Sequence, residues 1–264
     1  MKRPGLPVGP LARALRSDLK RVRSSPADAD AVHDSRVAAR KLLVAGELGT
    51  FAPPTDLLRR VVKRLGRVRN LDVAMEILVR GPVSEGRALS AVLLERRRKE
   101  AKRLARWLTA ERVRKVWRSL RDAAPPDLLS VPGDELRTYF TGLSSISTRL
   151  LVRPGAETAH EVRREVRRLR YAFEAAAGSF PPRDRRAIAR ILREAQESAG
   201  RWHDLCVLEQ LAHRAVREER MPSPPDLLLR RLRSQGQAQS RRFHRALRNL
   251  LKLRRLFLPE ETGP

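Results

Sequence analysis

Apolar residues recur along most of the chain at spacings of three and four, the period of an amphipathic α-helix. In the first such stretch, from about residue 11 to 23, Leu11, Leu15, Leu19 and Val22 lie on one side of the predicted helix. Leu, Ala and Val supply most of the apolar positions, and helix-forming residues dominate throughout. This pattern predicts an ordered all-α protein and argues against a disordered chain.

Prolines and glycines divide this helical pattern into segments. Pro26 ends the first helix, because the residue before a proline disfavours helical geometry, and the second helix ends near Pro53. Gly66 is predicted to end the third helix and Asn70 to cap the fourth. The predicted helices after the second cover residues 56–65, 71–79 and, as one very long helix, 85–122.

The same plan recurs after a proline-rich segment, DAAPPDLLSVPG. The recurring helices cover 135–151, 157–178, 183–199, 205–220 and 227–257, with Gly200 ending one helix and Asp204 capping the next. The sequence therefore predicts one domain, 1–264, made of two helical repeats, 11–122 and 134–257, with a linker at 123–133. Halves of about 120 residues exceed short solenoid repeats, and favour two antiparallel four-helix-type bundles with long helices, related by a pseudo-two-fold axis.

Two of the predicted helices carry the same His/Arg face. Counting from each histidine, arginines follow at +3 and +7 and a glutamate at +14. At helical geometry these positions fall within an arc of about 60°. The four residues are His33, Arg36, Arg40 and Glu47 in the first copy, and His160, Arg163, Arg167 and Glu174 in the second.

In the second copy an apolar stripe, from Val162 to Phe173, is predicted to face the core. The His/Arg face then borders the core where a groove between helices or bundles would lie, and Arg164, Arg168 and Tyr171 lie farther round. Arginine on a helix is usually solvated, and a single histidine is usually a surface or packed residue. Repetition in register favours binding for the set, and the glutamates are expected to orient arginines through intrahelical pairs.

A second pair of similar segments follows the two His helices: LGRVRNLDV at 65–73 and AGRWHDLCV at 199–207. Each contains the glycine predicted to end a helix and the residue predicted to cap the next one. The basic side chains between them would stand before a helix N-terminus, where free N–H groups attract anions. They are Arg67, Arg69, Arg201 and His203. The simple alternative is arginine exposed in a turn.

The charge balance of the chain is strongly basic. Its 57 lysines and arginines face 30 acidic residues, and only eight of the 57 are lysines, so the net charge is +27. Guanidinium groups meet phosphate oxygens in pairs and stay charged, although a GC-rich genome also raises the arginine content. Phosphate polymers are the first partner class to consider, because a polyanion relieves the self-repulsion. The basic runs at 96–106 and 241–252 are interpreted as solvated faces.

Several classes of protein are not expected from these residues. The single cysteine, Cys206, excludes an intramolecular disulfide and a thiolate metal cluster. A signal-peptide core and a run of ~18 apolar residues are both missing, so we expect a soluble, cytoplasmic protein without a membrane partner. The sequence also lacks a phosphate-binding glycine loop, zinc-type spacing and a nucleophile elbow, so we expect no enzyme activity, catalytic residue, cofactor or metal.

Four segments in order resemble the CHAD family, the conserved histidine α-helical domain: HDSRVAARKL, LGRVRNLDV, HEVRREVRRLRYAFE and GRWHDLCVL. The resemblance covers about residues 11–257 and implies two four-helix bundles whose basic residues converge on a central groove that binds inorganic polyphosphate. Carried over by position, the polyphosphate-binding residues are His33, Arg36, Arg40, Lys41, Lys63, Arg67, Arg69, His160, Arg163, Arg167, Arg170, Tyr171, Arg201 and His203.

The first half departs from the family pattern at two positions. Leu43 stands where an arginine is usual, matching Arg170 of the second half, and Asn70 replaces the usual aspartate. The first-half site is therefore expected to be the weaker one, or its helix to be turned slightly. Some members carry an attached triphosphate-processing domain, for which this chain is expected to have no room. The resemblance thus implies a stand-alone binder, with association with polyphosphate granules as a further expectation.

Two alternatives stay open. The charge also suits a nucleic-acid-binding basic helical protein, although aromatic residues make up only 4% of the chain and offer few stacking platforms. The His33-Asp34 and His203-Asp204 pairs resemble those of metal-dependent phosphohydrolases, but a two-residue motif has a high false-positive risk. For polyphosphate, affinity is expected to rise as pH drops from about 8 to 6, because a polyanion favours protonated histidine.

Overall fold

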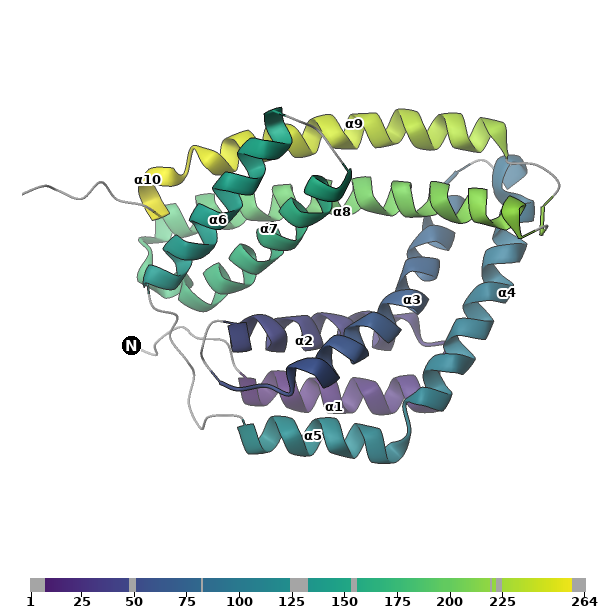
Figure 1. Ribbon diagram of the computed structural model, residues 1–264, viewed down its shortest axis with the longest axis horizontal. Coiled ribbons are helices and arrows are strands. Elements are labelled where there is room, and N and C mark those ends of the chain that lie inside the picture. Colours follow the sequence, from purple (N-terminus) through teal and green to yellow (C-terminus); the bar gives the residue numbers. More distant parts are fainter. Residues whose placement is uncertain are drawn as a thin grey trace, which may run out of the picture. The chain divides into compact units, whose positions relative to one another are not determined.

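The computed structural model describes residues 8–47, 51–81, 83–123, 133–152, 156–218, 220–221 and 225–257, and every regular element within these ranges is helical. This confirms the all-α prediction. The helices are α1 (Val8–Ser24), α2 (Ala29–Glu47), α3 (Thr55–Val79), α4 (Val83–Trp107), α5 (Ala110–Ala123), α6 (Gly133–Val152), α7 (Ala156–Ala176), the short 3-10 helix η1 (Ala177–Ser179), α8 (Pro182–Arg217), α9 (Asp226–Leu251) and α10 (Arg254–Phe257) (Figure 1). None of the described helices combines the length and apolarity needed to cross a membrane.

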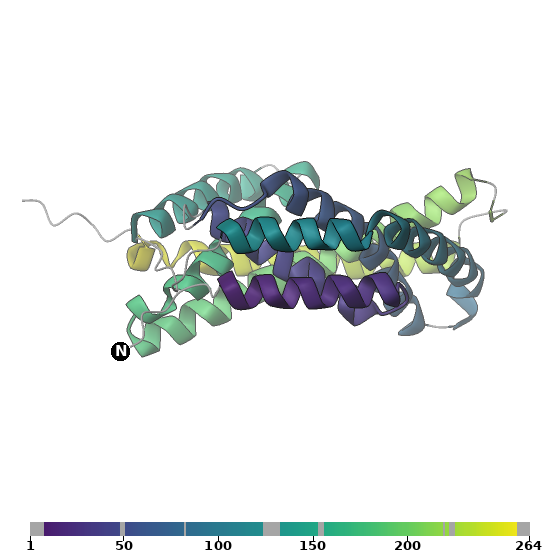
Figure 2. The same ribbon diagram turned by 90° about the horizontal axis from the view of Figure 1, so that it is seen from below.

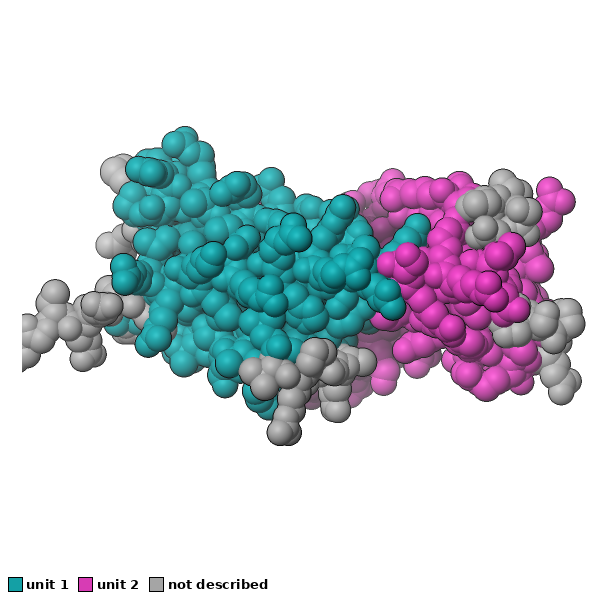
Figure 3. Space-filling view, turned by 90° about the horizontal axis from the view of Figure 1, so that it is seen from above, with its two compact units in different colours: residues 1–6, 127–203, 235–264 teal, residues 7–126, 204–234 magenta. Residues whose placement is uncertain are grey.

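The chain divides into two compact units, coloured teal and magenta in Figure 3. Unit 1 comprises residues 1–6, 127–203 and 235–264, and unit 2 comprises residues 7–126 and 204–234. The boundaries fall inside two long helices, so α8 and α9 each contribute residues to both units. The two repeats expected from the sequence stay a prediction.

Unit 2 is built on α1 to α5. Helix α1 packs against α2 and α5, and α2 packs against α3; Figure 2 shows α1 (purple) and α5 (teal) side by side. Leu15, Leu19 and Val22 of α1 are fully buried, as their spacing predicts. A second apolar cluster joins α3 and α4 to the unit 2 parts of α8 and α9. Its larger members are Leu71, Leu78, Leu89, Leu93, Leu205, Leu208, Leu228, Leu229 and Leu232.

Unit 1 contains the second predicted His helix, α7, packed against α6. The apolar stripe of α7 is buried, which confirms the predicted orientation of this helix. Its members Val162, Val166, Leu169 and Phe173 are at most 2% exposed. Aromatic rings complete this core, with centroid distances of 4.7 Å for Phe140–Phe257, 5.3 Å for Phe173–Phe180 and 5.9 Å for Phe180–Phe257.

The predicted helix ends at Gly66 and Gly200, and the predicted caps at Asn70 and Asp204, are wrong. The first pair of residues lies inside the continuous helix α3 and the second pair inside α8. A glycine in a helix interior costs only about 1 kcal/mol, which an uninterrupted buried stripe outweighs. In α3 that stripe runs through Leu58, Val61, Leu65, Val68 and Leu71.

The single helix predicted at 85–122 is also wrong, because a corner at Leu108 and Thr109 separates α4 from α5. Thr109 caps α5, since its Oγ1 accepts a hydrogen bond from the backbone N–H of Arg112 at 3.1 Å. The corner lets α5 fold back along α1 and bury Val113, Val116 and Leu120. The helix predicted at 227–257 likewise ends at Leu251, before the short α10.

Candidate functional site

The predicted binding residues of the first half lie on α2 and α3 of unit 2. His33, Arg36, Arg40 and Lys41 belong to α2, and Lys63, Arg67 and Arg69 belong to α3. The two helices pack together, so motifs separated in the sequence come into contact. The guanidinium group of Arg36 lies against Gly66, because a Cβ atom on this glycine would be 3.4 Å from Arg36 Nε. The missing side chain at Gly66 therefore leaves room for Arg36.

His33 lies at the same helix pair, where both Arg69 and Asp34 act on its ring. The pKa of His33 is lowered, first because its imidazole is partly buried and then because Arg69 repels a second positive charge, while Asp34 acts in the opposite direction. Arg69 is itself held by an ion pair, with Nη1 at 2.8 Å from Glu76 Oε1. A lowered pKa keeps His33 mostly neutral at pH 7, so its ring can donate one hydrogen bond to an anion.

The predicted binding residues of the second half lie on α7 and α8, within unit 1. His160, Arg163, Arg167, Arg170 and Tyr171 belong to α7, and Arg201 and His203 belong to α8. The rings of His160 and His203 are in contact, with centroids 5.9 Å apart and ring planes at 43°. Here too, folding brings a His-helix motif to the glycine-containing segment that follows it in the sequence.

Carboxylates on the same helices orient two of these arginines. Arg170 Nε donates to Glu174 Oε1 at 2.8 Å, and Arg201 Nη2 donates to Glu197 Oε2 at 3.2 Å. The first pair confirms the predicted role of Glu174 as an orienting residue. Arg170 also lies 5.7 Å from the centroid of the Tyr171 ring. Tyr171 is only 4% exposed, so it belongs to the core side of α7 and not to the outer side expected from the helical projection.

Helix N-termini do not contribute to anion binding at either glycine-containing segment. Arg67 and Arg69 lie in the interior of α3, and Arg201 and His203 lie in the interior of α8. Backbone N–H groups in a helix interior are bonded to carbonyls four residues earlier and are not offered to ligands. The expectation of free N–H groups there is wrong, and binding at these segments depends on the side chains.

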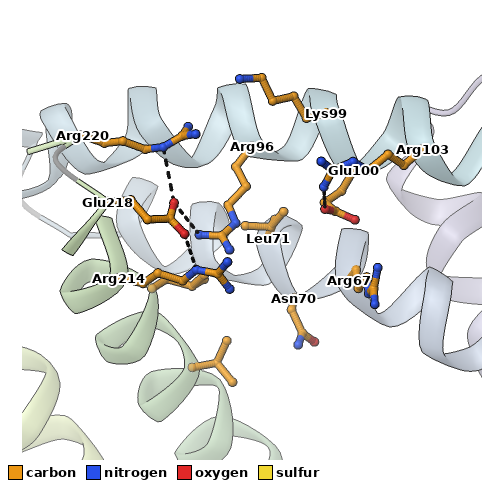
Figure 4. A pocket seen from close by; sticks show the side chains of 12 residues that line it. Arg67, Asn70, Leu71, Arg96, Lys99, Glu100, Arg103, Arg214, Glu218 and Arg220 are labelled. Carbon is orange, nitrogen blue, oxygen red and sulfur yellow. Dashed lines mark hydrogen bonds and ion pairs between the residues drawn. The ribbon is translucent and has the colours of Figure 1, made fainter. Parts of the chain in front are cut away.

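A pocket of about 640 Å³ opens in unit 2 where α3, α4 and the end of α8 meet (Figure 4). Its lining consists of Arg67, Asn70, Leu71, Arg96, Lys99, Glu100, Arg103, Val207, Leu211, Arg214, Glu218 and Arg220. Arg67 is the one residue that this lining shares with the predicted binding set. Sequence reasoning therefore missed most of the pocket. Three of its six basic residues, Arg96, Lys99 and Arg103, come from the run that was interpreted as a solvated face.

The interpretation of that basic run is wrong for Arg97, which is buried at 8% exposure. Its Nε donates to Asp72 Oδ1 at 2.8 Å, and its Nη2 and Nη1 donate to the carbonyls of Ala27 at 2.8 Å and Pro26 at 3.3 Å. A signal was available in the sequence. Arg97 stands four residues after Leu93 and four before Ala101, within a buried stripe of α4.

Within the part of the chain that the structure describes, no group of three His, Cys, Asp or Glu side chains is placed to hold a metal ion. Within the described ranges, neither the His33-Asp34 pair nor the His203-Asp204 pair is therefore part of a three-ligand group. The two groups of predicted binding residues, called the His/Arg sets below, carry guanidinium, ammonium and imidazole groups, which are hydrogen-bond donors that suit anions.

Comparison with known proteins identifies the fold. A family model described as CHAD domain matches residues 9–213. The chain is similar to the crystal structure of the CHAD domain from the plant Ricinus communis, with 21% identity and a TM-score of 0.69, covering 96% of this chain and 93% of that one. It is also similar to PptA from Streptomyces chartreusis, with 17% identity and a TM-score of 0.63, covering 93% and 99%. Among curated proteins there is no match.

Proposed function

Because this chain belongs to the CHAD domain family, we propose that it binds inorganic polyphosphate through its two His/Arg sets and does not catalyse a reaction. One observation carries the proposal: in each half, folding brings together two basic motifs that are separate in the sequence. Arg36 of α2 lies against Gly66 of α3, and the His160 ring of α7 contacts the His203 ring of α8. If the basic side chains served only as solvated surface, these two motifs would not need to meet in each half.

The side-chain chemistry supports a phosphate ligand. A guanidinium group presents parallel N–H donors that match two phosphate oxygens, and such charge-assisted hydrogen bonds are about twice as strong as neutral ones. The position of Arg170 on α7 is fixed by its hydrogen bond to Glu174 and by the neighbouring Tyr171 ring. A neutral His33 adds a hydrogen-bond donor without adding to the repulsion among the arginines.

A polymer of phosphate suits these sets better than a nucleic acid does. Every unit of a polyphosphate chain is charged, so successive guanidinium groups can each engage one phosphate. Nucleic acid binding usually adds base stacking on aromatic rings, and aromatic residues are only 4% of this chain. Both the spacing of the charges and the scarcity of aromatic rings therefore favour polyphosphate over nucleic acid.

The proposal predicts that affinity depends on chain length. Calorimetric titration with polyphosphates of graded length should show affinity rising until the His/Arg sets are filled, and falling with salt as counterions are released. Arg36→Gln and Arg170→Gln should each weaken binding of long chains by about tenfold, the effect of one charge-assisted hydrogen bond. Arg164→Gln, on the exposed side of α7, is the matched control.

Two outcomes would contradict the proposal. Equal affinity for short and long chains would remove the case for sets that grip successive phosphates, and displacement of polyphosphate by duplex DNA at equal phosphate concentration would favour the nucleic-acid alternative. The absence of catalysis has its own assay. Release of orthophosphate with added Mg²⁺ or Mn²⁺, abolished by His203→Ala, would show a phosphohydrolase instead.

A further inference from the structure

The pocket of α3, α4 and α8 in unit 2 carries more positive than negative charge. Six basic side chains line it against two carboxylates, which leaves a formal excess of four positive charges. The basic residues are Arg67, Arg96, Lys99, Arg103, Arg214 and Arg220, and the carboxylates are Glu100 and Glu218. Leu71 anchors the lining in the buried apolar cluster of unit 2, so the charged groups stand on a packed core.

One carboxylate is surrounded by three guanidinium groups. Glu218 Oε1 lies 2.5 Å from Arg214 Nε, and its Oε2 lies 3.4 Å from Arg220 Nε and 3.9 Å from Arg96 Nη1. Figure 4 shows these three arginines gathered about Glu218, while Arg103 pairs with Glu100 farther along α4. The Glu218 carboxylate thus occupies the position that an anionic ligand would take among these donors.

The carboxylate does not neutralise the cluster. The pKa of Arg96 is lowered, first because its guanidinium is partly buried and next because Arg214 repels it, with Arg220 adding to the effect and Glu218 opposing it. The pKa of Glu218 is lowered mainly by its hydrogen bond from Arg214. Arg96 is thus repelled by two neighbouring guanidinium groups and has one carboxylate, Glu218, between them.

Glu218 stands at an unfavourable place in the backbone. It follows the last residue of α8, where the negative end of the helix dipole disfavours a carboxylate. The N–H of Glu218 donates to the Arg214 carbonyl and that of Arg220 to the Ala215 carbonyl, each at 3.0 Å. Arg214, Glu218 and Arg220 also lie beyond residues 9–213, the part matched by the family model.

We infer that this pocket is a binding site for a short, multiply charged phosphate chain of the tripolyphosphate class, and that Glu218 competes with the ligand for the same guanidinium groups. The volume of about 640 Å³ is that of a small-ligand site, and the pocket is too small for a duplex. Its cations extend from Arg220 and Arg214 along α4 to Arg103, which suits several linked phosphates better than one. The inference does not depend on polyphosphate binding by the His/Arg sets.

A second ion pair on α8 supplies a matched control. Arg233 Nε of α9 donates to Glu209 Oε1 at 2.8 Å, in the same unit but outside the pocket lining. The experiment is calorimetric titration with tripolyphosphate of the wild type and of Glu218→Gln, Arg214→Gln, Glu209→Gln and Arg233→Gln. All five proteins are first compared by circular dichroism and thermal unfolding.

Glu218→Gln should tighten tripolyphosphate binding by about fivefold, because it removes the competing charge at an ion pair of ordinary partly exposed strength. Arg214→Gln should weaken it by about tenfold, as expected for one charge-assisted hydrogen bond to the ligand. Glu209→Gln and Arg233→Gln should leave the affinity within about twofold. If Arg214→Gln unfolds, Arg220→Gln replaces it in the same assay.

Equal affinities for the wild type, Glu218→Gln and Arg214→Gln would overturn the inference. It would also be overturned if only a His33→Ala/His160→Ala variant, and none of the pocket variants, lost tripolyphosphate binding. The proposed function fails in a different way. It fails if long polyphosphate does not bind the wild type. The pocket inference would still stand in that case, provided that Glu218→Gln and Arg214→Gln change the affinity for tripolyphosphate. Failure of tripolyphosphate to bind, with long chains bound normally, would refute the pocket and keep the proposed function.

Discussion

Arg97 joins three segments of unit 2 through one guanidinium group. It donates to the Asp72 carboxylate of α3 and to the carbonyls of Pro26 and Ala27 in the turn between α1 and α2. Asp72 is itself only 5% exposed, so both charges of the pair are withdrawn from water. A buried pair of this kind is costly to break, because the partner that remains has no solvent to stabilise its charge.

Arg97→Leu should therefore lower the free energy of unfolding by about 3–5 kcal/mol. Urea unfolding followed by circular dichroism measures the change. Arg98→Leu is the control, since Arg98 is exposed on the same helix and its replacement should stay within about 0.5 kcal/mol. The double variant Arg97→Leu/Asp72→Leu should recover part of the loss, whereas equal unfolding midpoints for Arg97→Leu and the wild type would contradict a structural role.

His33 is the residue at which pH should act. Its pKa in the folded protein lies below the ordinary value, so the unfolded chain binds the proton more readily. The stability contributed by the neutral ring is present above about pH 6.5 and is lost as the pH falls through the folded-state pKa. A bound polyanion acts in the opposite sense, because its negative charge favours the imidazolium ion.

We expect the affinity for long polyphosphate to rise as pH falls. Protonation of His33 should contribute to this rise mostly below about pH 6.5. This shifts the rise expected from the sequence toward its acid end. Binding curves between about pH 8 and 5.5 at constant salt measure it, and His33→Gln should remove that part of the slope. A flat profile in the wild type would refute a titrating role for the histidines.

At the scale of elements, α3 and α8 each carry a glycine in the middle of a long helix, and the two glycines have different surroundings. A Cβ atom at Gly66 would meet the guanidinium group of Arg36 at 3.4 Å, whereas a Cβ atom at Gly200 would meet no atom within 4 Å apart from its chain neighbours and the nearby backbone of its own helix. The first glycine therefore serves a contact between helices. The second shows no such contact in the described structure, and its helix tolerates the cost of a glycine through its buried stripe.

Gly66→Leu should displace Arg36 and weaken the binding of long polyphosphate by about tenfold, if Arg36 supplies one charge-assisted hydrogen bond. Gly200→Leu, the matched change in α8, should leave affinity unchanged and stabilise the protein by up to about 1 kcal/mol through helix propensity. Calorimetric titration and thermal unfolding measure the two effects. A loss of affinity in both variants, or in neither, would contradict the assigned role of Gly66.

Helix ends show which element predictions succeed from sequence and which do not. Helix α1 ends at Ser24, two residues before Pro26, as predicted, because proline disfavours helical geometry at the residue before it. The prediction ended a helix at Gly66, where α3 continues, and continued a helix through Thr109, where α4 and α5 are separate. Each changes helix stability by only about 1 kcal/mol, so the burial of neighbouring apolar faces decides whether the helix continues.

At the scale of the molecule, the chain has the CHAD domain fold and a net charge of +27. Its two compact units do not follow the chain in order, since α8 and α9 each supply residues to both. The pocket in unit 2 depends on this arrangement, because Arg67 and Arg96 come from the first part of the chain while Arg214 comes from α8. The large positive charge raises the local concentration of any polyanion, and placed groups such as these provide selectivity.

The sequence by itself determined the helical class, the two His/Arg sets and the family, because helical periodicity, charge and motif order can all be read along the chain. Only the tertiary structure decided that Arg97 is buried beside Asp72, that Arg36 lies against Gly66, and that Arg96 and Arg214 share a pocket with Glu218. Those facts depend on which helices pack together. Packing is set by the burial of many apolar side chains at once, and no single segment carries that information.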